Sequence, residues 1–406
     1  MINLELPKKI QDLQKMARQV AQEVFRPISR KYDLAEHEVP VELEMLASVM
    51  DGMDRGGGAT AGAGASAAHD GNGSADAGTS VRNGANMSTV AGIAELCWGD
   101  VGLLLGMPRQ GLGNAAIAAV ATPEQRERFA GCWAAMAITE PAAGSDSAAI
   151  RTTAVLDGDD YVLNGEKIYV TAGGRCDTVV VWATLDPSKG RAAIKSFVVP
   201  KDTPGLEVVR LDHKLGIRAS DTATIMLSDC RVPKENLLGS PEIEVEKGFA
   251  GVMQTFDNTR PMVAGMAVGL AQAALDRTRE VLDGVGVAID YDRPVWSVGA
   301  AQAELVRMEA ELEAARLLTL RAAWMADNRQ PNSKEASISK AKAGRVANAI
   351  TLRCVELCAS VGYAETDLIE KWARDSKILD IFEGTQQIQQ LIIARRILDK
   401  SSDQLR

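Results

Sequence analysis

One glutamate lies where a carboxyl group could act as a base. Glu383 precedes Gly384 and Thr385, between an apolar run that ends near Ile381 and another that begins at Ile388. Gly384 suits a helix C-cap and Thr385 an N-cap, which predicts Glu383 in the last turn of a helix. The negative end of the helix dipole disfavours a carboxylate there and raises its pKa, which suits a general base. A solvated surface glutamate is the alternative that this pattern leaves open.

Two further segments have the composition of ligand-binding loops. Residues 139–146 (TEPAAGSD) combine small side chains with a glycine, which leaves backbone N–H groups open to a phosphate or a polar ring edge. Residues 164–171 (NGEKIYVT) predict a hairpin turn at Asn164-Gly165, followed by an aromatic ring and a hydroxyl group. An ordinary linker and a hairpin without a function are the alternatives.

The cysteines and histidines give little support for a metal site. Cys354 and Cys358 have helical i, i+4 spacing, but His37, His69 and His213 are far from them in the sequence. We therefore predict that the two thiols are small buried groups and that the chain has no metal centre. Six cysteines in 406 residues do not resemble a secreted disulfide scaffold, and a cytoplasmic location is expected.

Composition favours a helical protein of two or three domains and argues against several classes of binding protein. The chain is 46% apolar and only 4% aromatic. With 45 Lys and Arg against 54 Asp and Glu, its formal net charge is −9, which argues against nucleic-acid binding. No apolar run reaches transmembrane length, and Glu5, Lys8 and Lys9 interrupt the N-terminal segment, so neither a membrane span nor a signal peptide is expected.

Periodicity divides the chain into three zones, which together predict an α+β fold that is mainly α. Residues 1–137 read as a helical domain, with helical patterning over 123–136 and a Gly- and Ala-rich irregular segment at 51–90. Residues 138–240 read as a small antiparallel β domain, with strands at 152–156, 167–171, 177–185 and 194–199 and a tight turn at Asp157-Gly158. Residues 241–406 read as a helical bundle, and one apolar stripe is formed by Leu305, Met308, Leu312, Ala315 and Ala322.

Five segments, in this order and at these intervals, resemble the FAD-dependent acyl-CoA dehydrogenases. They are residues 139–146, 164–171, 215–222 (LGIRASDT), 256–261 (FDNTRP) and 382–385 (FEGT). The resemblance covers nearly the whole chain except about 51–90. It implies an N-terminal helical domain, a middle antiparallel β domain and a C-terminal four-helix bundle. It also implies FAD between the last two domains, a tetramer, and electron transfer to an electron-transfer flavoprotein.

The same resemblance implies roles for individual residues. Glu383 would remove the α proton of an acyl-CoA thioester while the β hydrogen leaves as a hydride to flavin N5, giving the trans-2-enoyl-CoA. The residues expected to bind FAD are Met136, Ile138, Thr139, Gly144, Ser145, Tyr169, Thr171, Thr385 and Gln387. Those expected to bind the substrate are Ser145, Asp257, Arg260 and Gly384. A surface ion pair at a helix start is the alternative for Asp257 and Arg260.

Two elements depart from the family pattern where the family contacts the adenosine half of a neighbouring subunit's FAD. Residues 291–299 carry Pro294 near a phenylalanine position, and Glu356, Ala359 and Ser360 replace a glutamine and two glycines. We therefore expect a heterotetramer with a related chain in preference to a homotetramer. A heteromer makes a bulky acyl group more plausible, such as a sterol side chain or a branched acid, beside the fatty acids of β-oxidation. A non-catalytic assembly subunit and an acyl-CoA oxidase are the alternative functions.

Overall fold

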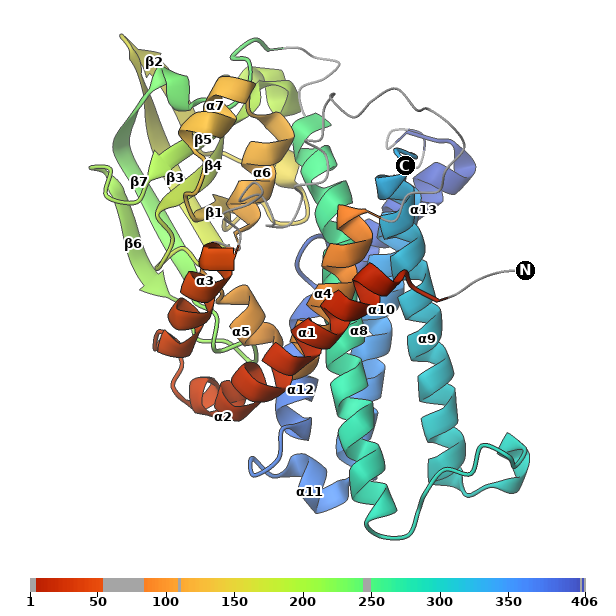
Figure 1. Ribbon diagram of the computed structural model, residues 1–406. Helices are drawn as coiled ribbons and strands as arrows, with labels where there is room; N and C mark the ends of the chain where they lie inside the picture. Colours follow the sequence, from red (N-terminus) through yellow and green to blue (C-terminus); the bar gives the residue numbers. More distant parts are fainter. Residues whose placement is uncertain (1–4, 54–83, 109–110, 244–249, 402–403, 405–406) are drawn as a thin grey trace.

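Two helical regions flank a curled sheet in the computed structural model, which describes residues 5–53, 84–108, 111–243, 250–401 and 404. Figure 1 shows the sheet on one side of the molecule and the long helices of the C-terminal bundle on the other, with the N-terminal helices packed against both. The predicted fold class is therefore confirmed. Within the described residues, no helix is both long and apolar enough to cross a membrane.

The N-terminal region consists of short helices packed against the bundle and the sheet. Its elements are α1 (Lys8–Val20), a π-helical turn (Ala21–Phe25), α2 (Arg26–Leu34), α3 (Val41–Met53), α4 (Ala85–Gly99), α5 (Val101–Leu105), α6 (Leu112–Val120) and α7 (Pro123–Arg128). The Gly- and Ala-rich segment predicted at 51–90 lies outside the described residues over 54–83. Its ends are helical, since α3 continues to Met53 and α4 begins at Ala85, so the irregular segment was predicted too long.

The middle region is a seven-stranded sheet with the order β1-β4-β2-β3-β7-β6, to which β5 adds beside β4. Its strands are β1 (Ala134–Ala137), β2 (Thr153–Asp157), β3 (Asp160–Thr171), β4 (Thr178–Thr184), β5 (Ile194–Pro200), β6 (Leu206–Leu211) and β7 (Thr222–Pro233). The pairing is antiparallel apart from the β1–β4 pair and the Thr153–Thr184 contact, which are parallel. The helix predicted over 123–136 ends at Arg128, because pairing with β4 overrides the helix propensity of the alanines in β1.

The two predicted tight turns have different outcomes. Asp157 and Asp160 pair across a hairpin turn, and Gly158 has the positive φ of 66° that such a turn needs. Asn164-Gly165, in contrast, lies inside β3 at a bulge opposite β7, so the hairpin prediction there was wrong. Gly165 is required because a Cβ at this position would lie 2.4 Å from Oγ1 of Thr152.

The C-terminal region is the predicted helical bundle. It contains α8 (Ala250–Asp283), α9 (Ala300–Asp327), α10 (Ser333–Leu357), α11 (Ala359–Tyr363), α12 (Ile369–Ser376), a 3-10 turn (Lys377–Asp380) and α13 (Gln386–Leu398). Every member of the predicted apolar stripe is buried on α9. Cys354 and Cys358 are buried free thiols, as predicted.

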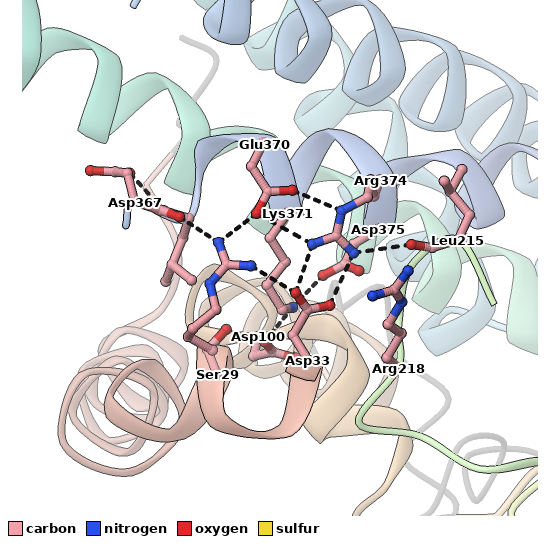
Figure 2. Close-up of polar contacts among 12 residues, drawn as sticks. Ser29, Asp33, Asp100, Leu215, Arg218, Asp367, Glu370, Lys371, Arg374 and Asp375 are labelled. Atoms are coloured by element: carbon pink, nitrogen blue, oxygen red, sulfur yellow. Dashed lines mark hydrogen bonds and ion pairs between the residues drawn. The ribbon is translucent and has the colours of Figure 1, made fainter. Parts of the chain in front are cut away.

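A buried ion network joins α12 to both other regions (Figure 2). The Lys371 ammonium donates to Asp100 Oδ2 at 2.7 Å and to Asp375 Oδ2. Asp100 also accepts from the Ser29 hydroxyl and from the Leu103 amide at the start of α5. Burial alone would lower the pKa of Lys371, but the two carboxylates outweigh it and hold that pKa above its usual value.

The same network reaches the segment that connects β6 and β7. Asp375 Oδ1 accepts from the Ile217 amide at 2.5 Å. Gly216 approaches the backbone of Arg374 and Asp375 so closely that a Cβ would lie 2.6 Å from it. Arg374 donates to both Asp33 on α2 and the Leu215 carbonyl (Figure 2). The three regions therefore meet at α12, a few residues before Glu383.

We predict that Lys371→Met destabilises the protein by about 3–5 kcal/mol at neutral pH, because two carboxylates would remain buried without a cation. Burial already raises the pKa of Asp375, and loss of Lys371 would raise it further. A group whose pKa is raised in the folded state makes the protein less stable as pH rises through that pKa. The difference in unfolding free energy between Lys371→Met and the parent should therefore shrink toward pH 5. Urea unfolding of both proteins at a series of pH values measures this difference.

Lys189→Met is the matched control, since Lys189 is exposed and has no ion pair within the described residues. It should leave the unfolding midpoint close to that of the parent at every pH. A Lys371→Met protein that loses little unfolding free energy, or whose loss does not change with pH, would contradict the proposed role of the buried ammonium.

Candidate active site

Glu383 lies in a turn beyond the end of a helix. The 3-10 turn before it ends at Asp380, and Glu383 and Gly384 have φ values of 57° and 94°. The prediction that Glu383 occupies the last turn of a helix was therefore wrong. The N-cap prediction for Thr385 is confirmed, because its side chain accepts from the Ile388 amide at 3.4 Å at the start of α13.

Two buried side chains fix the backbone of this turn. Gln389 Nε2 donates to the carbonyl oxygens of Glu383 and Gly384 at 3.0 and 3.1 Å. Lys340 Nζ donates to the Gly384 carbonyl at 2.7 Å from α10. Both residues are at most 1% exposed. The sequence analysis missed them, although a lysine among the small residues of α10 and a glutamine within an apolar helix were the available signals.

The Glu383 carboxyl group faces a hydroxyl group and two cations. Thr259 Oγ1 on α8 donates to Glu383 Oε2 at 2.7 Å. Burial raises the pKa of Glu383, while the bond from Thr259 and the charges of Arg260 and Lys340 partly offset this increase. The raised pKa agrees with the sequence prediction, but its cause is burial instead of a helix dipole. Burial also lowers the pKa of Lys340 to about 8.

Asp257 and Arg260 form an ion pair inside α8, with Nη1 and Oδ1 2.5 Å apart. Ser333 at the start of α10 donates to the same carboxylate oxygen at 3.2 Å. Arg260 is only 2% exposed, so the pair is not the surface ion pair that remained as an alternative. Its arrangement places the Arg260 charge near Glu383. Contact of either residue with a substrate remains a prediction.

A buried cluster around Glu140 holds the loop that follows β1. The Glu140 carboxylate accepts from Lys167 Nζ at 2.7 Å, from Thr152 Oγ1 at 2.6 Å, and from the backbone amides of Arg151 and Thr152. Lys167 also donates to the Ile138 carbonyl at 3.1 Å. These bonds fix residues 138–140 against β3 and the start of β2. The sequence analysis had quoted Glu140 and Lys167 without giving them a role.

The loop brings several of the predicted FAD residues to one place. The Ile168 amide donates to the Thr139 carbonyl at 2.9 Å, which sets Thr139 beside Tyr169. Tyr169 has a φ of 61° and is 64% exposed, so its ring is available to a ligand. A Cβ on the exposed Gly144 would meet no atom within 4 Å. In the described part of the chain, the hydroxyls of Thr139, Ser145 and Thr171 have no hydrogen-bond partner.

These observations fit the flat ring and phosphates of FAD, because unpaired hydroxyls and an unobstructed glycine face lie beside an exposed aromatic ring. Met136 and Phe256 pack on one apolar cluster, which connects β1 with the beginning of α8. No hydrogen bond or ion pair within the described ranges joins Glu383 to Thr139 or Tyr169. Gln387 is exposed, and Ile138 is 8% exposed. The FAD contacts of individual residues stay predictions.

Two family models match the chain, with a gap between them. The acyl-CoA dehydrogenase middle-domain model matches residues 135–230, and the C-terminal-domain model matches residues 246–398. The first match begins at β1, and the second contains Thr259, Lys340 and Glu383. The matched parts therefore contain both the FAD-binding candidates and the candidate base.

Individual relatives agree with these matches. The mitochondrial short-chain specific acyl-CoA dehydrogenase of Mus musculus is 40% identical over 268 residues, which are 66% of this chain and 63% of the mouse protein. A subunit of the caffeyl-CoA reductase-Etf complex of Acetobacterium woodii is 38% identical over 66% of this chain and 68% of its own length.

A solved structure shows the same architecture over nearly the whole chain. Butyryl-CoA dehydrogenase from Megasphaera elsdenii superposes with a TM-score of 0.80 and 28% identity, covering 98% of this chain and 100% of that one. The family models, the sequence relatives and this structure give one answer. The chain belongs to the acyl-CoA dehydrogenase family, whose members are FAD-dependent flavoproteins.

Proposed function

We propose that this chain catalyses α,β-dehydrogenation of an acyl-CoA thioester, with Glu383 as the base that removes the α proton. The observation that carries the proposal is the position of Glu383: a partly buried residue whose carboxyl group has a raised pKa, on a turn fixed by Lys340 and Gln389. A base with a pKa nearer neutrality is suited to an α proton of low acidity. Bound FAD would accept the β hydrogen as a hydride.

The backbone of the same turn can also stabilise the thioester. No described residue accepts from the Glu383 N–H, which is therefore free to donate to a thioester carbonyl as negative charge develops on its oxygen. Because Gln389 and Lys340 bind the two carbonyl groups of the turn, this N–H keeps a fixed direction. Carboxylate and amide would then act on adjacent atoms of one substrate.

The names of two relatives support a short acyl group as the first substrate class to test and an electron-transfer flavoprotein as the acceptor. Anaerobic addition of short, long, branched and sterol-derived acyl-CoA thioesters to the flavin-loaded chain tests this proposal by bleaching of the flavin absorbance. Bleaching by none of them would favour a non-catalytic assembly subunit, and rapid oxygen consumption during turnover would favour an oxidase.

Glu383→Gln tests the base. We expect the variant to retain flavin and to lose at least about 100-fold in the rate of bleaching, because the amide cannot take the α proton. Stopped-flow absorbance measures this rate. Glu365→Gln, which changes an exposed glutamate, should react at the parent rate. A Glu383→Gln protein that bleaches at the parent rate would exclude Glu383 as the base.

Thr259→Val tests the hydrogen bond that favours the carboxylate. Its loss should raise the pKa of Glu383, and because the ionised form is the active one, the acidic limb of the pH–rate profile should move to higher pH. Thr259→Ser keeps the hydroxyl and should restore the parent profile. A uniform loss of rate without a shift of the limb would indicate a structural role alone.

The heteromeric assembly remains our preferred proposal for the oligomer, and the departing elements support it. Ala359 has a φ of 47°, so a methyl group stands in a conformation that favours the glycine of the family pattern. Glu356 is 54% exposed and would repel a neighbour's pyrophosphate, although it pairs with Arg353. Trp296 and Tyr291 are 88% and 64% exposed, which suits a surface covered by another subunit.

We predict that co-purification with a related chain gives tetramers with half as many flavins as subunits. Native mass spectrometry with flavin quantification measures both numbers. A tetramer of this chain alone with one FAD in every subunit would contradict the heteromeric proposal while leaving the dehydrogenase proposal intact.

A further inference from the structure

Glu36 and His37 meet His213, which is far from them in the sequence, beside the β6–β7 connection. Glu36 and His37 lie in the connection between α2 and α3, and His213 follows β6. One potential ligand atom from each residue lies within 4.8 Å of the others. The rings of His37 and His213 have centroids 4.7 Å apart at an interplanar angle of 56°.

His37 carries the strongest indication that this cluster has a ligand. Both of its ring nitrogens are buried, and neither has a hydrogen-bond partner in the described part of the chain. An imidazole has at least one donor and one acceptor, and buried polar atoms are rarely left without partners. His37 also has a φ of 74°, a backbone conformation that histidine and asparagine adopt more often than most residues other than glycine. An ion bound to one nitrogen would supply a missing partner.

Contacts with two neighbouring residues hold the Glu36 carboxylate in place within the cluster. Its Oε1 accepts from the Lys214 amide at 2.8 Å, and its Oε2 lies 2.8 Å from Nδ1 of His213. Because the amide bond orients the carboxylate through Oε1, Oε2 can turn from the His213 ring to an ion.

We propose that Glu36, His37 and His213 bind a divalent transition-metal ion of the Zn²⁺ type. Two imidazole nitrogens and one carboxylate oxygen are a common ligand set for zinc, which takes a fourth ligand from water or from another molecule. The His213 side chain is 82% exposed, so it can rotate toward the ion and leaves an access path from solvent. His37, whose ring nitrogens are buried, and the partly buried Glu36 form the fixed side of the site.

The neighbouring charges are compatible with an ion of this kind. The Lys214 ammonium lies 3.9 Å from Glu36 Oε1 but donates to the Ser220 carbonyl at 2.8 Å, away from Oε2. Arg218 donates through Nε to the Lys214 carbonyl. Glu36 is therefore the anionic ligand of the three, and the two imidazoles would bind the ion in their neutral form.

A bound ion would connect the N-terminal helices directly to the segment between β6 and β7. That segment continues to Ile217, whose amide binds Asp375 in the buried network. The site thus lies at the edge of the junction where the three regions meet, outside the candidate active site. Its expected role is structural, and its existence does not depend on the proposed dehydrogenation.

The test uses the full-length flavin-loaded chain, freed of metal with a chelator and titrated with ZnCl₂ by calorimetry and with CoCl₂ by visible absorbance. We expect one metal ion per chain, cobalt bands typical of nitrogen and oxygen ligands, and a higher melting temperature with Zn²⁺. His37→Asn, which tolerates the positive φ, and His213→Ala should each weaken binding at least about tenfold.

Glu38→Gln is the matched control, because it removes an exposed carboxylate next to the cluster. It should bind Zn²⁺ like the parent. The proposal is wrong if the parent binds no metal, or if His37→Asn and His213→Ala bind Zn²⁺ as tightly as Glu38→Gln. The exposed His213 can be replaced without disturbing the core, so a folding defect of His37→Asn would not prevent a decision.

Discussion

A buried ammonium group must be matched by fixed negative charge. Lys371 is such a group, and it lies where the three regions of the molecule meet. Its partners come from two regions, Asp100 from the N-terminal helices and Asp375 from its own helix. Because Asp375 also accepts from the Ile217 amide, the sheet is included in the same arrangement. Hydrophobic packing alone is non-directional, whereas these bonds have a single geometry. We infer that the network determines how the three regions are oriented around the segment that leads to Glu383.

In the candidate active site, by contrast, the cations near the carboxyl group are bound by other groups. Among the described residues, Glu383 has no direct ion pair; Arg260 and Lys340 affect its carboxyl group from a distance, and Thr259 donates to it. A direct ion pair would stabilise the carboxylate strongly and lower its basicity. Arg260 is instead paired with Asp257, and Lys340 binds the Gly384 carbonyl. The two cations are thus engaged by other groups, which keeps Glu383 basic enough to accept a proton.

Local patterns predicted those features that depend on local physics. The α9 stripe, the β2–β3 hairpin at Asp157-Gly158 and the Thr385 cap were all visible in the sequence, because periodicity, turn chemistry and capping act over a few residues. Asn164-Gly165 was misread because a bulge and a turn require the same residue types. The strand at β1 was missed because alanines favour a helix until a partner strand is present.

The site was predicted only in part, for a similar reason. Glu383 and Thr139 lie in recognisable segments, but Lys340, Gln389 and the Glu140 cluster act through contacts between distant segments. His37 and His213 show the same limit, since the 175 residues between them give no sign that they meet. Sequence spacing predicts chemistry on one element well, and chemistry shared between elements poorly.

The Glu140 cluster has a consequence for how the cofactor loop behaves before any ligand arrives. In the part of the chain that the structure describes, all of its bonds come from the sheet and the segments next to it, and none from the bundle. The loop at 138–140 is therefore ordered by its own region and does not need the bundle to take its shape. A loop that is already rigid loses little conformational entropy when it binds, so more of its contact energy is available as affinity.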